Sequence, residues 1–120
     1  MKFILITMLS VFCLGANAST VALFSCDLLD GKTIDDVKRV NSQWVKAVNK
    51  FAKTEVSSQV LESVVSTNMK GFMFVDTYKD TAAWGEIRHQ IKLGAVKEID
   101  AEFDITSECT SVSLYDSENS

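Results

Sequence analysis

The sequence predicts a single α+β domain, residues 19–120, with the element order β-α-β-β-α-β. Three observations lead to this prediction. Apolar residues recur at helical spacing in two regions, and four other segments alternate or are rich in β-branched residues. The two cysteines beyond the N-terminal segment, Cys26 and Cys109, fall in the first and last predicted strands. A domain of this length can bury a modest core.

Residues 1–18 have the three parts of an export signal. Lys2 supplies a positive charge, residues 3–16 form an apolar run, and "ANA" at 16–18 is a small-x-small cleavage site before Ser19. The run is shorter than the roughly 20 residues of a stable membrane span, and a retained anchor is the alternative. We expect cleavage, export to the periplasm or the medium, and no membrane association afterwards.

The first strand and helix are read from periodicity. Residues 20–28 are apolar on both alternating faces, which is typical of a strand covered on both sides. Thr33 is a good N-cap, and two aspartates follow where the helix dipole favours acids. A helix is therefore predicted over residues 34–53.

The second half repeats this alternation of strands and helices. Gly94 interrupts its helical stripe and divides it into two segments. The predicted elements are a strand over 57–67, a turn over 68–71, a strand over 72–78, a helix capped by Asp80 or Thr81, a helical segment ending near 105, and a strand over 109–116.

This order is that of the ferredoxin-like, or split βαβ, arrangement, with sheet order 4-1-3-2. Its first and last strands are antiparallel neighbours, so Cys26 and Cys109 come within reach of each other. We predict one disulfide, closing a loop of about 84 residues and stabilising the fold by about 4–5 kcal/mol. Free thiols or a redox pair are the alternatives, disfavoured by the lack of C-x-x-C spacing.

The arrangement also predicts a partner. Both helices cover one face of the sheet, yet the first and third strands are apolar on both sides. A bare apolar face calls for a cover, and a second copy of the chain is the simplest one. We therefore expect a homodimer through the open sheet face. The net charge of −4, without a basic patch, argues against nucleic acid and anionic membranes as partners.

The element order and the two-sided strands resemble the dimeric α/β-barrel superfamily of ferredoxin-like proteins. The segments "CDLLDGKTIDDVKRVNSQWV" and "FMFVDTY" also resemble small uncharacterised exported proteins of marine bacterial type. The superfamily includes cofactor-free monooxygenases, haem-handling enzymes, lactone isomerases and plain binding proteins, so the fold does not select an activity. The resemblance implies a ligand cleft between the sheet and the helices.

Asn41 is the most unusual residue of the first predicted helix. At 100° per residue it falls in the middle of the apolar stripe, beside Trp44. The resemblance implies that both residues line the cleft, because some cofactor-free monooxygenases hold substrate and oxygen with an Asn and a Trp of this helix. Those two residues are usually four apart, whereas here they are three apart. A structural alternative is that Asn41 bonds a backbone carbonyl or a buried water.

Three titratable residues are further candidates. Asp76 shares a strand face with three aromatic residues and could act as a base in the cleft, although a position near the strand end favours a solvated carboxylate. Arg88 could pair with an anionic ligand or Asp76, and a surface salt bridge is the favoured alternative. His89, the one histidine, falls opposite the inner stripe and is expected in solvent.

We expect no cofactor and no metal. Phosphate loops and nucleophile elbows are absent, and two cysteines with one histidine are too few for a closed zinc site. The favoured function is non-catalytic, a binding or accessory protein. The alternatives are a monooxygenase-like or isomerase-like enzyme with a pocket around Asn41 and Trp44, and a purely structural dimer.

Overall fold

In the computed structural model the described part of the chain is residues 18–119. The predicted signal peptide, residues 1–18, lies almost wholly outside this range and stays a prediction. The elements are β1 (Ser19–Leu28), α1 (Ile34–Asn49), β2 (Ser57–Glu62), β3 (Gly71–Tyr78), α2 (Thr81–Lys92), α3 (Lys97–Thr106) and β4 (Ser107–Ser117).

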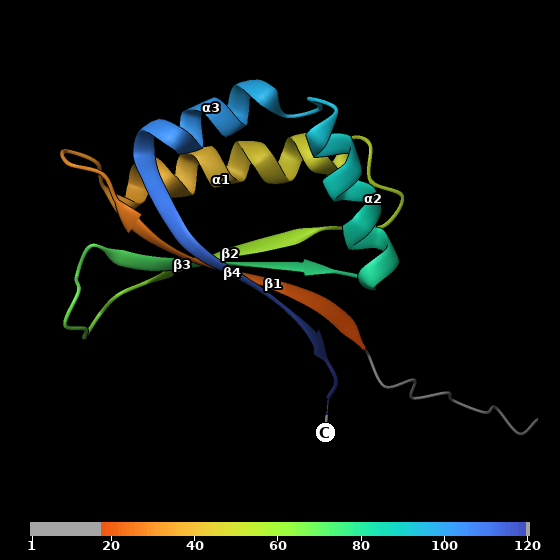
Figure 1. Cartoon of the computed structure of the whole chain (residues 1–120), viewed down its shortest axis with the longest axis horizontal. Coiled ribbons are helices and arrows are strands. Elements are labelled where there is room, and N and C mark those ends of the chain that lie inside the picture. The colour runs from red at the N-terminus through yellow and green to blue at the C-terminus, as the bar shows by residue number, and fades with distance from the viewer. Residues whose placement is uncertain (1–17, 120) are drawn as a thin grey trace, which may run out of the picture.

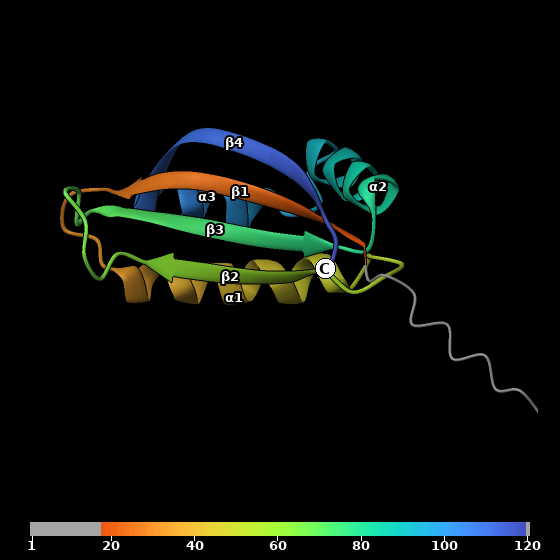
Figure 2. The ribbon, with the colours of Figure 1, turned by 90° about the horizontal axis from the view of Figure 1, so that it is seen from below.

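The four strands form one antiparallel sheet in the order β2-β3-β1-β4. This is the predicted ferredoxin-like order, with the first and last strands adjacent. All three helices cover the same face of the sheet, as Figure 1 shows, and the view from below in Figure 2 looks onto the bare face. No helix within residues 18–119 is long and apolar enough to cross a membrane.

Helix α1 begins as predicted and ends four residues earlier than expected. Thr33 and Asp36 form a capping box, in which each side chain accepts the other residue's backbone N–H. The prediction that the helix reaches residue 53 was wrong. The amide of Asn49 bonds both backbone groups of Val56 at 2.8 and 2.9 Å, so the chain turns there towards β2.

Strand β2 is shorter than predicted because β3 offers it no partner beyond Glu62. Pairing stops at Glu62–Phe72, and the next residues form the hairpin loop. Val64 and Val65 are 84% and 94% exposed there. The β-branched run to residue 67 had the propensity for a strand, but strands form only where a neighbouring backbone completes the hydrogen bonds.

The interruption at Gly94 is confirmed. Gly94 has φ of +95°, a left-handed conformation that ends α2 at no steric cost for glycine. Helix α3 then starts after the buried Val96 and runs directly into β4. The helical layer therefore contains three helices, and α3 lies alongside α1 above the sheet (Figure 1).

The hydrophobic core between helices and sheet is divided into two clusters. One gathers around Trp44 and Val48, the other around Val37 and Phe74. Phe24 and Phe103 are half-buried and pack against both clusters. On the opposite face of the sheet, Val21, Leu23, Met73 and Val75 are only partly buried, so the predicted bare apolar face is present.

Candidate functional site

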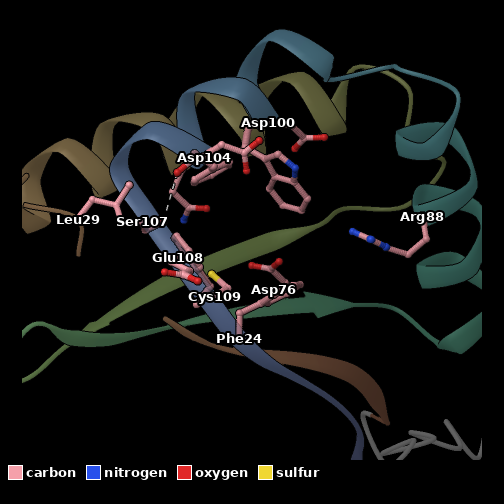
Figure 3. Close-up of a pocket in the computed structure, with 13 residues that line it drawn as sticks. Phe24, Leu29, Asp76, Arg88, Asp100, Asp104, Ser107, Glu108 and Cys109 are labelled. Atoms are coloured by element: carbon pink, nitrogen blue, oxygen red, sulfur yellow. Dashed lines mark hydrogen bonds between the residues drawn. The ribbon is translucent and has the colours of Figure 1, made fainter. Parts of the chain in front are cut away.

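A cleft of about 490 Å³ opens at the junction of the two core clusters, between the sheet and all three helices. Figure 3 shows its side chains converging from the sheet below, α3 above and α2 at one end. The lining residues are Phe24, Leu29, Asn41, Trp44, Phe74, Asp76, Arg88, Asp100, Phe103, Asp104, Ser107, Glu108 and Cys109.

Aromatic rings make up much of the apolar lining. Phe74 is the centre of this group, with edge-to-face contacts to Phe24, Phe72 and Phe103 at centroid distances of 6.5, 5.1 and 5.4 Å. Trp44 lines the same cleft from α1, and its indole N–H has no hydrogen-bond partner within residues 18–119. These rings offer flat apolar surfaces from the sheet and from two helices.

Asn41 and Asp76 are joined by the hydroxyl of Ser58 on β2. Asn41 Nδ2 donates to Ser58 Oγ at 2.9 Å, and Ser58 Oγ lies 2.5 Å from Asp76 Oδ1 and 3.2 Å from Asn41 Oδ1. Since a hydroxyl has one proton, the shorter contact assigns it to Asp76. The buried amide of Asn41 is therefore held by a side chain, and neither predicted alternative, a backbone carbonyl or a water, is needed to explain it.

Asp76 is buried, so the expectation of a solvated carboxylate was wrong. It lies in the cleft to which α1, α2 and α3 all contribute side chains, and the residue is 6% exposed. Burial raises the pKa of Asp76 to about 6, although the Ser58 hydrogen bond and the charge of Arg88 act in the opposite direction. Its second oxygen, Oδ2, has no hydrogen-bond partner in the described chain, and the Asp76 side chain lines the cleft (Figure 3).

Arg88 reaches the cleft from α2, as Figure 3 shows, and is half-buried. The favoured surface salt bridge is absent from the described residues, where the four ion pairs use other basic side chains. Burial raises the pKa values of both Asp76 and Asp100, and the positive charge of Arg88 is close enough to offset part of that rise. His89, the next residue, is exposed as predicted.

Three further acids line the opposite wall. Asp100 and Asp104 come from α3 and Glu108 from the start of β4. Asp104 and Glu108 are exposed, whereas Asp100 is half-buried and burial raises its pKa. Nothing in the sequence singled these acids out, because acidic residues are usually solvated. Only the docking of α3 and the start of β4 against the rest of the domain places them at the cleft.

Ser58 was also missed, although the alternation of β2 contained a signal. Ser58 and Val60 point to the same side of the strand, opposite Asp76 and Phe74 of β3. A serine on the apolar side of a strand is a candidate partner for a buried polar group. Without the register of β2 against β3, nothing connected it to Asn41.

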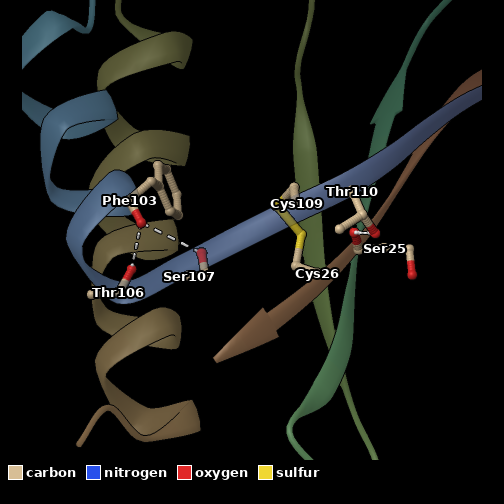
Figure 4. Close-up of a disulfide and its surroundings, with 7 residues drawn as sticks. All are labelled: Ser25, Cys26, Phe103, Thr106, Ser107, Cys109 and Thr110. Atoms are coloured by element: carbon tan, nitrogen blue, oxygen red, sulfur yellow. Dashed lines mark hydrogen bonds between the residues drawn. A yellow bond between two sulfur atoms is a disulfide. The ribbon is translucent and has the colours of Figure 1, made fainter. Parts of the chain in front are cut away.

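The predicted disulfide is present and forms part of the cleft wall. Cys26 and Cys109 are directly paired between β1 and β4, with Cα atoms 3.9 Å apart. Figure 4 shows the bridge beside the junction of α3 and β4, where Thr106 and Ser107 donate to the carbonyl of Phe103. The bridge therefore ties the wall that carries the three additional acids to the central strand β1.

Within residues 18–119 no group of three or more His, Cys, Asp or Glu side chains is placed to hold a metal ion. The four acids of the cleft are thus spread along its walls. What the arrangement offers chemically is a buried hydrogen-bond acceptor, flat aromatic surfaces and an excess of carboxylates over basic groups.

No protein-family model matches the sequence, and no curated protein matches it. Solved structures match the fold. SnoaB from Streptomyces nogalater, described as a cofactor-independent oxygenase, superposes with a TM-score of 0.64 at 10% identity over 88% of this chain and 97% of its own. A dimeric ferredoxin-like protein of unknown function from Thermobifida fusca superposes with a TM-score of 0.51 at 13% identity, over 91% of this chain and 96% of its own.

This chain has the ferredoxin-like fold that it shares with these solved structures. A conserved protein of unknown function from Bacteroides thetaiotaomicron, described as a "possible oxidoreductase", superposes with a TM-score of 0.52 at 12% identity over 87% of this chain and 100% of its own. Identities this low establish the fold alone. The resemblance to exported marine bacterial proteins stays a prediction.

Proposed function

We propose that the protein binds a flat, aromatic small molecule in the cleft beside Trp44. The observation that carries this proposal is a cavity of about 490 Å³ beside Asn41 and Trp44. A core filled with side chains at this place would have argued against a binding site. Ligand cavities of this size, mostly apolar with a few convergent polar groups, are the usual form of a small-molecule site.

The geometry of the cleft suggests how such a ligand would be held. Its ring would lie against the indole of Trp44 and the faces of Phe24 and Phe103, where stacking adds to the gain from burial. A hydroxyl or amine on the ring would donate to Asp76 Oδ2, which has no partner in the described chain. Asn41 would act indirectly by holding Ser58, and through it Asp76, in one orientation.

A ligand screen by thermal shift, with small hydroxylated and amino-substituted bicyclic aromatics, tests this proposal. We expect hits to raise the melting temperature of wild type, and Trp44→Leu to lose them. Asn41→Ala should lower the melting temperature and weaken binding together. Val64→Ser, on the exposed hairpin loop, is the matched control and should keep wild-type binding. If no probe binds, or if Trp44→Leu binds equally well, the proposal fails.

A catalytic role is the second candidate, and the observation that favours it is the buried carboxylate of Asp76. A carboxylate with a pKa near 6 is matched to proton abstraction near neutral pH. Asp76 would take a proton from an activated C–H or O–H of the ligand, leaving an anion on the ring. Reprotonation at another carbon would complete an isomerisation, and reaction of the anion with dioxygen would begin a cofactor-free oxygenation.

Solvent deuterium exchange into a bound probe with an acidic C–H, followed by NMR, separates binding from catalysis. We expect wild type to accelerate exchange above the buffer rate, and Asp76→Asn to bind the probe without accelerating it. If wild type binds the probe but deuterium exchange proceeds only at the buffer rate, the protein binds this ligand without catalysing proton abstraction.

We also propose a homodimer through the bare sheet face, formed by an exported chain that has been cleaved after residue 18. Val21, Leu23, Met73 and Val75 supply the apolar surface, and the disulfide suits an oxidising compartment. Light scattering should give twice the chain mass, and Val75→Lys should give a monomer that still folds. Ser19 should be the first residue of protein recovered outside the cytoplasm, as N-terminal sequencing can check.

A further inference from the structure

The cleft carries a strong imbalance of charge. Four carboxylates line it, those of Asp76, Asp100, Asp104 and Glu108, whereas Arg88 is the only basic residue among its lining side chains. None of the four carboxylates has an ion-pair partner within the described part of the chain. The cleft is therefore a region of negative potential, and its low-dielectric walls strengthen that potential.

The acids are not simply a solvated cluster on a helix. Asp76 is only 6% exposed, its side chain lines the cavity, and its Oδ2 has no hydrogen-bond partner in the described chain. It lies on the sheet, on the other side of the cleft from Asp100 and Asp104 of α3 (Figure 3). A group bound in the cleft would thus have carboxylates on two sides.

Aromatic rings complete the surroundings of such a group. Trp44, Phe24, Phe74 and Phe103 line the same cavity as the acids. Ring faces attract cations through their quadrupole, most strongly for tryptophan and in sites shielded from water. Carboxylates together with ring faces favour a positively charged, weakly hydrated ligand over a neutral or anionic one.

We propose that the cleft selects cationic ligands, an aromatic or alkyl body that carries a protonated amine or a quaternary ammonium group. This inference rests on the proposed binding function and adds the charge of the ligand to it. Arg88 reaches the cleft from α2 and its charge acts on both Asp76 and Asp100. The ammonium group therefore belongs on the side of the cleft away from Arg88, between Asp76 and the acids Asp104 and Glu108 (Figure 3). The acids of α3 and β4 set the preference for charge, and the rings set the preference for shape.

Three probes of nearly equal size test the inference by isothermal titration at pH 7.5. N-methylquinolinium is cationic, quinoline is neutral and 2-naphthoate is anionic. We expect the cation to bind at least about tenfold more tightly than quinoline, and 2-naphthoate to bind most weakly. Raising the salt concentration should narrow the difference between the probes, because part of the attraction is screened.

Matched variants then assign the preference to the cleft. The triple variant Asp100→Asn/Asp104→Asn/Glu108→Gln should bind N-methylquinolinium with nearly the affinity of quinoline, and Arg88→Gln should bind it more tightly than wild type. The control Asp35→Asn/Glu55→Gln/Glu118→Gln removes the same charge from exposed positions outside the cleft and should keep the preference. If the triple variant does not fold, the exposed Asp104→Asn and Glu108→Gln are tested singly.

The outcomes distinguish this inference from the proposed function. Equal binding of all three probes in wild type would overturn the charge preference and leave the aromatic site standing. A preference that falls equally in the triple variant and in its surface control would reflect the net charge of the protein and would also overturn it. Failure of every probe to bind would overturn the proposed function and this inference together.

Discussion

The two walls of the cleft differ in how they hold their polar groups. In the wall built by α1, β2 and β3, Asn41, Ser58 and Asp76 form one hydrogen-bonded chain, and Asn41 and Asp76 are almost fully buried. In the wall built by α3 and β4, Asp104 and Glu108 are exposed and have no such bonds among the described residues. The second wall is instead tied to the sheet by the disulfide.

This difference suggests a division of roles. Buried polar groups cost free energy unless they are hydrogen-bonded, so the first wall keeps one arrangement and can orient a ligand. Exposed acids cost little and contribute mainly charge. Substitutions in the first wall should therefore change both stability and ligand binding. Substitutions in the second wall should change ligand binding alone, except for removal of the disulfide, which should also lower stability.

Removing the tether should have the largest effect on stability. Cys26→Ala/Cys109→Ala opens a loop with a sequence separation of 83 residues, and the chain-entropy model gives a decrease of about 4–5 kcal/mol in the free energy of unfolding. Urea unfolding measures the decrease. Relative to wild type, amide hydrogen exchange in the variant should accelerate more in β4 than in β2. Equal acceleration of both strands would mean that the bridge does not act on the second wall in particular.

Neutralising Asp76 should have the next largest effect, and it should be stabilising. The folded-state pKa of about 6 lies above the ordinary value of 3.8, so ionisation favours the unfolded chain by about 3 kcal/mol once the pH exceeds both values. Wild-type stability should fall as the pH rises from 4 to 7. Asp76→Asn should be more stable than wild type at pH 7, by up to that amount, and similar to it below pH 4.

Urea unfolding of both proteins at pH 3.5 and 7.5 measures this difference. If the variant is less stable than wild type at pH 7.5, the prediction that burying the ionised Asp76 carboxylate destabilises the fold is contradicted. Such a result would mean that the carboxylate's hydrogen bond to Ser58 and its attraction to Arg88 outweigh the cost of burying its charge.

Ser58→Ala should break the hydrogen-bonded chain of the first wall. It leaves both Asn41 and Asp76 without their partner and should cost about 1–3 kcal/mol. Because the Ser58 hydrogen bond lowers the pKa of Asp76, that pKa should rise further in the variant, which carboxyl ¹³C NMR can follow. Ser57→Ala, one residue earlier on the exposed side of β2, is the control. Equal melting temperatures for the two variants would argue against the network.

Substitutions in the second wall should have the smallest effect on stability. Asp104→Asn and Glu108→Gln change exposed side chains without ion pairs in the described chain, so each should shift the free energy of unfolding by less than about 0.5 kcal/mol. Calorimetry checks this. A larger decrease from either variant would remove the distinction between a structural wall and a charged one.

The sequence was a good guide where local pattern and topology agreed. Helical periodicity placed Asn41 in the buried stripe of α1 beside Trp44, and both line the cleft. The element order brought Cys26 and Cys109 opposite each other. These predictions succeeded because a helix face and the neighbours of a strand follow from periodicity and chain order.

The predictions that failed depended on what packs above or beside a segment. Asp76 was expected in solvent because it is near a strand end, but it is buried in a cleft that side chains of all three helices help to enclose. The run to residue 67 was expected to continue β2, but β3 begins at Gly71 and pairs no further than Glu62. In both cases the outcome depended on the position of another element.

By itself, the sequence determined the order of elements, the pairing of the cysteines and the inward direction of Asn41, since each follows from spacing along the chain. Only the tertiary structure decided that Ser58 joins Asn41 to Asp76 and that α3 turns its acids towards the aromatic rings. Those interactions connect residues of different elements. They depend on the register of β2 against β3 and on the docking of α3, which no local pattern encodes.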